Sequence, residues 1–402
     1  MKFTYKTTIY TSFISYIVQA VVNNFAPLLF LTFQNSYGIP LSQITILISI
    51  NFIIQLLVDA AATLFLDKIG YRIGLVSAHI CAALGLISMT ILPDLFQNSF
   101  AGLVISVMLY AIGGGLIEVI VSPVVEACPY EHKEQTMSIL HSFYCWGCVG
   151  VVVISTLFFC IFGISNWKII ALIWSLLPVA NALMFTKVPL AELIEEGETA
   201  LPLLSLLKNK LFLIFLAVVL CAGASEQVIA QWSSTFVEKS LGLPKTIGDL
   251  LGPAIFAVAM GTGRSLYGTH GHKIDLEALM IKSGVLCIFS YLLIALIPIP
   301  AFALIGTAVC GAAVAILWPG TYSLASANIK NGGSAMFALL ALSGDLGCSV
   351  GPTVVGAVSG FFGDNLKLGT LAAIIFPLVM LAFLRMKSRI EYGLKGRNQL
   401  DF

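Results

Sequence analysis

Long apolar runs, separated by short polar segments, recur along the whole chain. About 20 apolar residues are enough to cross the hydrocarbon core of a bilayer as a helix. The pattern predicts an all-α membrane protein with twelve transmembrane helices, at positions 9–33, 42–66, 73–92, 99–125, 138–163, 167–186, 211–236, 246–268, 276–298, 300–328, 334–361 and 366–385. The first run follows a short basic segment and is too long for the core of a signal peptide, so we expect it to remain as a helix.

The composition agrees with this architecture. Hydrophobic residues make up 58% of the 402 positions, charged residues only 10%, and the mean hydropathy is +0.98. Soluble domains have about 25% charged residues, so we expect neither an enzyme nor a cofactor. The net charge of +1 gives no basis for binding nucleic acid. We expect the partners to be membrane lipid and a small-molecule solute. The nine cysteines lie mostly within predicted helices, which argues against a disulfide framework.

The loop charges predict an orientation. Most of the 21 Lys and Arg residues, Arg264 among them, fall in segments that lie on the same side as the two termini. Segments rich in Lys and Arg stay in the cytoplasm. We therefore expect a multi-pass protein of a bacterial cytoplasmic membrane, with both termini cytoplasmic.

The chain divides into two halves at an acidic, proline-flanked segment. The predicted parts are a six-helix half at 1–186, a cytoplasmic linker at 187–210, and a second six-helix half with a short tail at 211–402. Faint internal similarity supports a duplication: Gly147-Cys148 matches Gly347-Cys348, and Ser122-Pro123 matches Trp318-Pro319. Transporters built from parallel six-helix repeats place their site near the membrane midplane, between the repeats.

Four carboxylates interrupt the predicted helices, at Asp59, Glu118, Glu226 and Asp345. A charge at the bilayer centre costs about 2.5–3.5 kcal/mol on insertion scales, so such groups normally face a water-filled path or a bound ion. Glu118, Glu226 and Asp345 are our candidates for proton coupling, with His141 as a possible relay. The alternatives are a buried structural pair for Glu118, a bond to Ser349 for Asp345, and a structural histidine.

Amides, hydroxyls and indoles suit a hydroxylated solute. Gln19 and Asn23 share a helix face, as do Glu118 and Ser122, because each pair is four residues apart. The predicted solute contacts are Gln19, Asn23, Asn24, Ser122, Tyr144, Gln227, Gln231, Trp232 and Trp318. Polar side chains also join transmembrane helices to one another, and tryptophans also lie at membrane interfaces, so both alternatives stay open.

The loop after the second predicted helix reads Asp67-Lys68-Ile69-Gly70-Tyr71-Arg72. It resembles the signature G-x-x-x-D-R-x-G-R-R/K of the major facilitator superfamily, with Thr63 in place of the first glycine. The resemblance implies a cytoplasmic gate formed by Asp67, Lys68, Gly70 and Arg72. Asp59 lies eight residues earlier on a similar face, so a role at the gate and a role toward solute are equally open.

Further motifs are similar to those of the fucose–proton symporter branch of that superfamily. They are the pair Asn23-Asn24, followed by Gln34; Glu118 and Pro123 in the fourth helix; Leu140-His-Ser-Phe-Tyr-Cys-Trp-Gly147 in the fifth; and Glu226 with Trp232 in the seventh. The resemblance implies proton-coupled sugar uptake, with Glu118 in the coupling or sugar-binding position. The branch has an aspartate in the first helix where this chain has Pro27, and Glu226 or Asp345 is the alternative second carboxylate.

We therefore expect a monomeric secondary transporter that imports a small, sugar-like solute with protons as the coupling ion. A proton-driven efflux antiporter is the first alternative. Such antiporters carry G-x-x-x-G-P in the fifth helix, where this chain has Gly147-Cys-Val-Gly150 and no following proline. A non-transporting membrane sensor is the second alternative, and the short tail after Arg385 leaves little room for an output domain.

Overall fold

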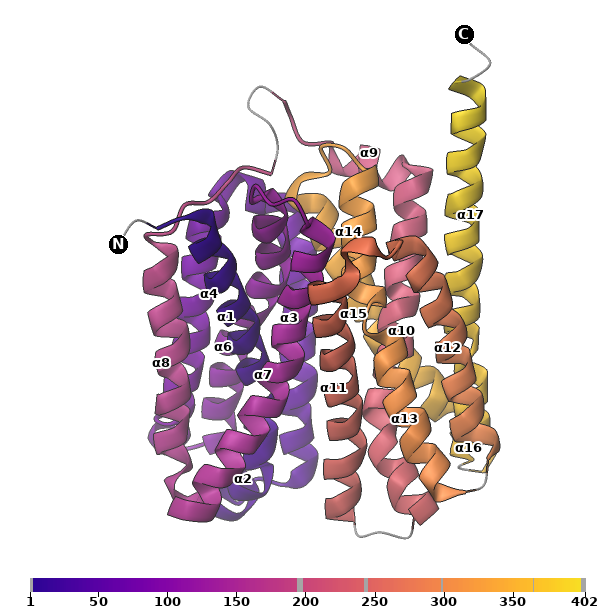
Figure 1. The fold of residues 1–402 in the computed structure, drawn as a ribbon. Coiled ribbons are helices and arrows are strands. Elements are labelled where there is room, and N and C mark those ends of the chain that lie inside the picture. Colours follow the sequence, from indigo (N-terminus) through magenta and orange to yellow (C-terminus); the bar gives the residue numbers. More distant parts are fainter. Residues whose placement is uncertain (1–2, 194–197, 242–244, 298, 364, 399–402) are drawn as a thin grey trace. The chain divides into compact units, whose positions relative to one another are not determined.

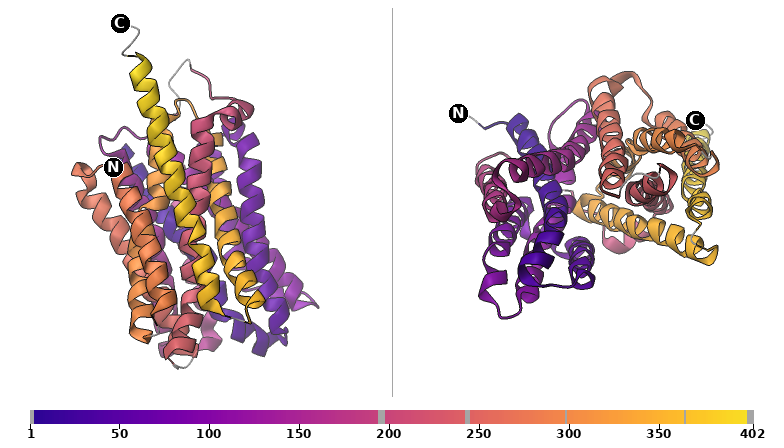
Figure 2. Two further views of the ribbon diagram at one scale, coloured as in Figure 1. Left: turned by 90° about the vertical axis from the view of Figure 1, so that its right-hand side faces the viewer. Right: turned by 90° about the horizontal axis from the view of Figure 1, so that it is seen from below.

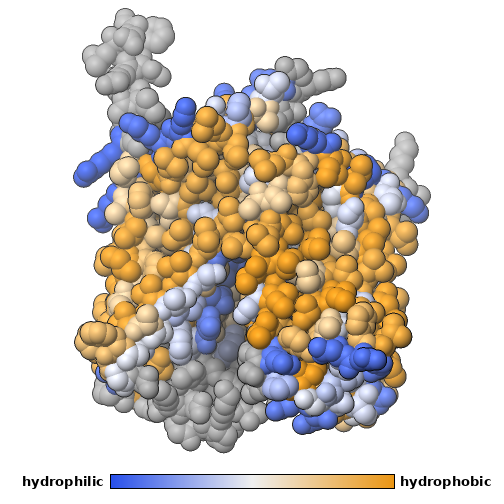
Figure 3. All heavy atoms as spheres, turned by 180° about the vertical axis from the view of Figure 1, so that it is seen from behind, coloured by the Kyte–Doolittle hydropathy of each residue, from blue (hydrophilic) through white to orange (hydrophobic). Residues whose placement is uncertain are grey.

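The computed structural model describes residues 3–193, 198–241, 245–297, 299–363 and 365–398. Within these ranges every regular element is helical. Eleven of the helices described there are long and apolar enough to cross a membrane. Figure 3 shows apolar side chains along the flanks of the helices and hydrophilic ones toward their ends. The predicted all-α membrane class is confirmed.

The first compact unit comprises residues 1–131, 143–200 and 333–341. It contains α7 (Lys133–Phe162) from Phe143 onward and the start of α15 (Gly333–Phe361). Its other elements are α1 (Tyr5–Asn24), η1 (Ala26–Leu29), α2 (Phe30–Tyr37), α3 (Leu41–Ile69), α4 (Tyr71–Met89), α5 (Leu92–Leu95), α6 (Ser99–Ala127), η2 (Ile164–Asn166) and α8 (Trp167–Phe185) (Figure 1).

The second compact unit comprises residues 132–142, 201–332 and 342–402. It takes the first turns of α7 and the rest of α15. Its other elements are α9 (Leu203–Lys208), α10 (Lys210–Leu241), α11 (Lys245–His270), η3 (Gly271–Lys273), α12 (Leu276–Leu296), α13 (Pro300–Val314), α14 (Leu317–Asn328), α16 (Leu366–Ala373) and α17 (Ile375–Asn398). Within each unit the long helices run side by side (Figures 1 and 2).

Prolines break two spans that the hydropathy pattern predicts as continuous. The predicted span 9–33 is divided into α1, η1 and α2 around Pro27. The predicted span 300–328 is divided into α13 and α14 at residues 315–316, just before Pro319. A proline has no N–H to donate to the carbonyl four residues earlier. Hydropathy does not register this loss, because it counts side chains and not backbone donors.

Small residues allow the closest helix contacts. In the first unit, a Cβ on Gly113 would lie 2.5 Å from the carbonyl oxygen of Ala78, where α6 crosses α4. In the second unit, a Cβ on Gly347 would lie 2.0 Å from the carbonyl oxygen of Leu220, where α15 crosses α10. Transmembrane helices associate through such contacts because lipid supplies no hydrophobic force between them.

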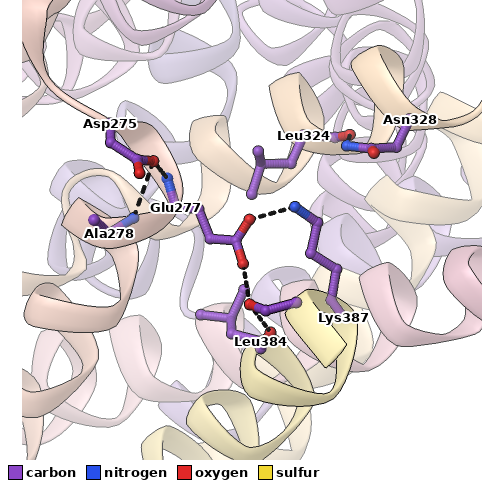
Figure 4. A network of polar contacts seen from close by, with 8 residues as sticks. Asp275, Glu277, Ala278, Leu324, Asn328, Leu384 and Lys387 are labelled. Carbon is purple, nitrogen blue, oxygen red and sulfur yellow. Dashed lines mark hydrogen bonds and ion pairs between the residues drawn. The ribbon is translucent and has the colours of Figure 1, made fainter. Parts of the chain in front are cut away.

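A polar network joins the first turn of α12 to α17 (Figure 4). Glu277 pairs with Lys387 and accepts a hydrogen bond from Ser388, and Asp275 caps the start of α12. Lys387 is only 3% exposed. The predicted span ends at residue 385, whereas α17 continues to Asn398, so the predicted short tail is helical up to that residue.

At the end of the first unit away from Thr4, Asp94 of α5 joins two other elements. Its carboxylate pairs with Lys168 of α8 and accepts a hydrogen bond of 2.9 Å from the Tyr37 hydroxyl of α2. The bond from Lys168, with that from Tyr37, lowers the pKa of Asp94 below its usual value, against a smaller effect of burial. Half of the Asp94 side chain is exposed, so solvent screens the pair.

This lowered pKa gives a pH-dependent contribution to stability. The ionised Asp94 stabilises the fold above its unfolded pKa, near 3.8, and the contribution is lost as the pH falls through the lower folded value. We expect Asp94→Asn to cost about 0.5 kcal/mol at pH 7, as exposed ion pairs do. Thermal unfolding in detergent at pH 7 and at lower pH measures this cost. A cost that grows on acidification would contradict the assignment.

Candidate functional site

A cluster of polar side chains lies inside the first unit, where α1 meets α6. Gln19 of α1 donates a hydrogen bond of 2.6 Å from Nε2 to Oε2 of Glu118. One turn away on each helix, the hydroxyls of Tyr16 and Ser122 lie 3.0 Å apart. The shared faces predicted for Gln19 and for Glu118 thus meet each other. Tyr16 was not among the predicted contacts.

Asn23 extends this cluster to α3 and α7. Its Oδ1 accepts hydrogen bonds from Asn51 Nδ2 at 3.1 Å and Gln55 Nε2 at 2.8 Å. Its Nδ2 donates to the hydroxyl of Tyr144 at 3.3 Å. Sequence reasoning missed Asn51 and Gln55, although two amides four residues apart in an apolar run were a usable signal. The neighbouring Asn24 donates to the Ala20 carbonyl and to the Cys148 sulfur.

Two acceptors of the cluster remain unsatisfied. Gln19 Oε1 and Asn51 Oδ1 are buried and have no hydrogen-bond partner among the described residues. Leaving a buried acceptor unpaired costs about 1–3 kcal/mol. A small cavity of about 20 Å³ borders Asn23, Asn51 and Pro27. The cluster therefore favours a small ligand that brings hydrogen-bond donors.

An ion pair lies inside the second unit. Arg264 of α11 donates from Nη2 to Oε2 of Glu226 of α10 at 3.0 Å. Its Nε donates to the Ala315 carbonyl at 2.9 Å, and its Nη1 to the His141 carbonyl at 3.3 Å. Arg264, which we counted among the charges on the cytoplasmic side, is 3% exposed within α11. Glu226 has a cationic partner that sequence reasoning did not find.

Aromatic side chains gather in the same unit. Trp318 stacks on Tyr322 at a centroid distance of 6.3 Å, and the Tyr322 ring meets the His141 ring edge-on. Trp232 donates from Nε1 to the Pro352 carbonyl at 3.3 Å. The aromatic rings that we predicted for solute contact thus come from α10 and α14.

Three further predicted residues of this unit are Gln227, Gln231 and Asp345. Gln227 is half-buried and Gln231 is exposed. Asp345 is half-buried in α15, and Ser349 donates to its backbone carbonyl rather than to its carboxylate.

The residues predicted to form a gate occupy the junction of α3 and α4. Gly70 alone separates the two helices and has φ 82°, a conformation that favours glycine. Arg72 donates to the carbonyls of Phe185 and Val188, at 2.6 and 3.0 Å, and so covers the end of α8. Lys68 is exposed and Asp59 is fully buried. The side chain of Asp67 lies outside the described part of the structure.

Apolar helices that enclose buried polar clusters define a multi-pass integral membrane protein. The family model of the Major Facilitator Superfamily matches residues 9–352. The chain therefore belongs to the Major Facilitator Superfamily, a family of transporters and not of enzymes. A comparison with the curated proteins finds no match.

Solved transporters share the fold. FucP in the outward conformation has a TM-score of 0.81 and 16% identity over 94% of this chain and 98% of that chain. FucP is described as the fucose:proton symporter of E. coli. The proton:xylose symporter XylE has a TM-score of 0.76 and 13% identity over 95% of each chain. The human organic anion transporter MFSD10 has a TM-score of 0.70 and 15% identity over 94% of this chain and 99% of that chain. At these identities the likeness concerns the fold.

Proposed function

We propose that this transporter imports a small, sugar-like solute by proton symport with alternating access. The main support is the polar cluster of the first unit, in which a carboxylate, several amides and two unsatisfied acceptors lie together. Sugar hydroxyls donate hydrogen bonds to such acceptors. The rings of Trp232 and Trp318 offer apolar faces against which a sugar ring can stack.

Glu118 is the proposed proton carrier. It lies within the apolar helix α6, next to an amide that can remain bonded to either protonation state of the carboxyl group. Glu226 already has Arg264 as its partner, so it is the second candidate for the proton carrier. Asp345 and His141 stay as further candidates. No cofactor is part of the proposal.

The proposal extends to the setting of the protein. We place it as a monomer in the cytoplasmic membrane of a bacterium, with both termini on the cytoplasmic side. The gate proposed for that side consists of Asp59, Asp67, Lys68, Gly70 and Arg72.

The test is proton uptake evoked by sugar in proteoliposomes, followed with a pH-sensitive dye in the external medium. The panel holds L-fucose, D-xylose, D-galactose, D-glucose and mannitol, each added without a pre-formed gradient. We expect one or more of them to make the external medium alkaline, because symport carries protons inward with the solute. If no solute does so while an imposed proton gradient drives extrusion of hydrophobic cations, the efflux alternative is favoured and the symport proposal fails.

A further inference from the structure

The break before α14 leaves a backbone carbonyl that needs a donor. In a continuous helix the Ala315 carbonyl would accept from the N–H of residue 319. Residue 319 is a proline, which has no N–H. Helix α13 ends at Val314 and α14 begins at Leu317. A buried carbonyl in this position must find another partner.

Arg264 supplies that partner from another helix. Its Nε donates to the Ala315 carbonyl, and the other two nitrogens of the same planar group bond His141 of α7 and Glu226 of α10. The Ser138 hydroxyl in turn donates to the Arg264 carbonyl at 2.8 Å. One rigid guanidinium therefore fixes the position of Ala315 relative to two further helices.

Glu226 makes the burial of this guanidinium possible. A buried cation without a counter-charge is strongly disfavoured, and Glu226 accepts at 3.0 Å from a side chain that is only 3% exposed. The carboxylate is therefore the group that keeps Arg264 in place.

Trp318 lies in α14, three residues after Ala315, and is 8% exposed. The face of its indole lies against Gly344, where an added Cβ would come within 2.2 Å of Cη2, and against Gly223. The two glycines provide the space for the ring. The break at Ala315 sets where α14, and hence the ring, enters that space.

We propose that Arg264 is a positioning residue that, held by Glu226, fixes the helix break at Ala315 and thereby the orientation of Trp318. The effect of Arg264 on solute binding rests on the proposed function, in which Trp318 contacts the sugar. The geometric part concerns the fold of the second unit alone and does not depend on a solute.

The test uses Trp318 as the only tryptophan, with Trp146, Trp167, Trp174 and Trp232 each changed to Phe. We measure acrylamide quenching of its fluorescence in detergent. Arg264→Lys keeps the charge that pairs with Glu226 but cannot donate to three acceptors in one plane. We expect it to raise the quenching constant at least twofold. Pro319→Ala restores an N–H that can donate to the Ala315 carbonyl. This variant should also raise the quenching constant, because α13 and α14 can then join.

The control is Asp94→Asn, which removes an ion pair from the other compact unit. It should leave the quenching constant unchanged. In the double variant, the increases in the quenching constant caused by Arg264→Lys and Pro319→Ala should not add, because both changes act through the Ala315 carbonyl. Unchanged quenching in Arg264→Lys, or additive effects, would overturn the proposal. If Arg264→Lys does not purify as a folded protein, unchanged quenching in Pro319→Ala overturns it instead.

A second readout connects the geometry to transport. For the sugar that the panel identifies, we expect Arg264→Lys to raise KM about tenfold with little change in maximal rate, since a displaced Trp318 weakens contact with the sugar. An unchanged KM together with raised quenching would keep the positioning role and remove the contact of Trp318 with solute. The two proposals can therefore fail separately.

Discussion

Glu118→Gln should abolish sugar-evoked proton uptake. A glutamine at this position keeps the size of the side chain and can still accept the hydrogen bond from Gln19, but it cannot carry a proton. Losing a positioned proton-transfer group typically costs about 10²–10⁴-fold, so we expect at least a hundredfold loss. The measurement is external alkalinisation in proteoliposomes on adding the sugar that the panel identifies.

Exchange of labelled against unlabelled sugar separates coupling from binding. Exchange does not require net proton movement, so we expect Glu118→Gln to retain part of it if the residue serves coupling. The matched control is Asp94→Asn, the same chemical change at a carboxylate in the same unit but outside the polar cluster. Full proton uptake in Glu118→Gln would remove Glu118 from the mechanism and leave Glu226 and Asp345 as the candidates.

Gly347→Ala should have the largest effect on stability of any single methyl group added to the described helices. The new Cβ would lie 2.0 Å from the carbonyl oxygen of Leu220 and 3.0 Å from the nitrogen of Ala224. These are backbone atoms, so no rotamer change can relieve the overlap, and α10 and α15 must separate. We expect a loss of about 3 kcal/mol, the upper part of the usual range for overpacking. Thermal unfolding in detergent, followed by size-exclusion chromatography, measures it.

Gly360→Ala is the control for this substitution. Gly360 lies in the same helix, and a Cβ added there meets nothing within 4 Å. Alanine is also the better helix former, so this variant should be as stable as the wild type or slightly more so. Equal stability of the two variants would show that α10 and α15 do not approach as closely as the structure has them.

The sequence predicted the helices better than their interruptions. Hydropathy identified the spans because lipid exposure requires apolar side chains over the whole length of a helix. The break at Ala315 follows from Pro319 and from a donor on another helix, Arg264. The proline was visible in the sequence. The donor was not, because periodicity says which residues share a face and not which helix that face meets.

The same limit explains the candidate site. Gln19, Asn23 and Glu118 were predicted from spacing within single helices. The structure joins Gln19 of α1 to Glu118 of α6, and Asn23 to α3 and α7. Arg264 was counted with the cytoplasmic charges because it lies near the end of the predicted span 246–268 and close to Lys273. Its burial depends on Glu226, a distant residue in sequence whose helix packs beside α11.

The composition of the two compact units has a consequence for synthesis on the ribosome. Residues 132–142 belong to the second unit, yet they are made well before α11, whose residues Arg264 and Tyr267 bond to them. Residues 333–341 belong to the first unit but are made after all of its other residues. The first unit therefore cannot be completed when its own half of the chain has been inserted, whereas residues 132–142 are already present when the second half is made. Fragments cut at the linker 187–210 would each lack a segment that the intact chain supplies from its other half.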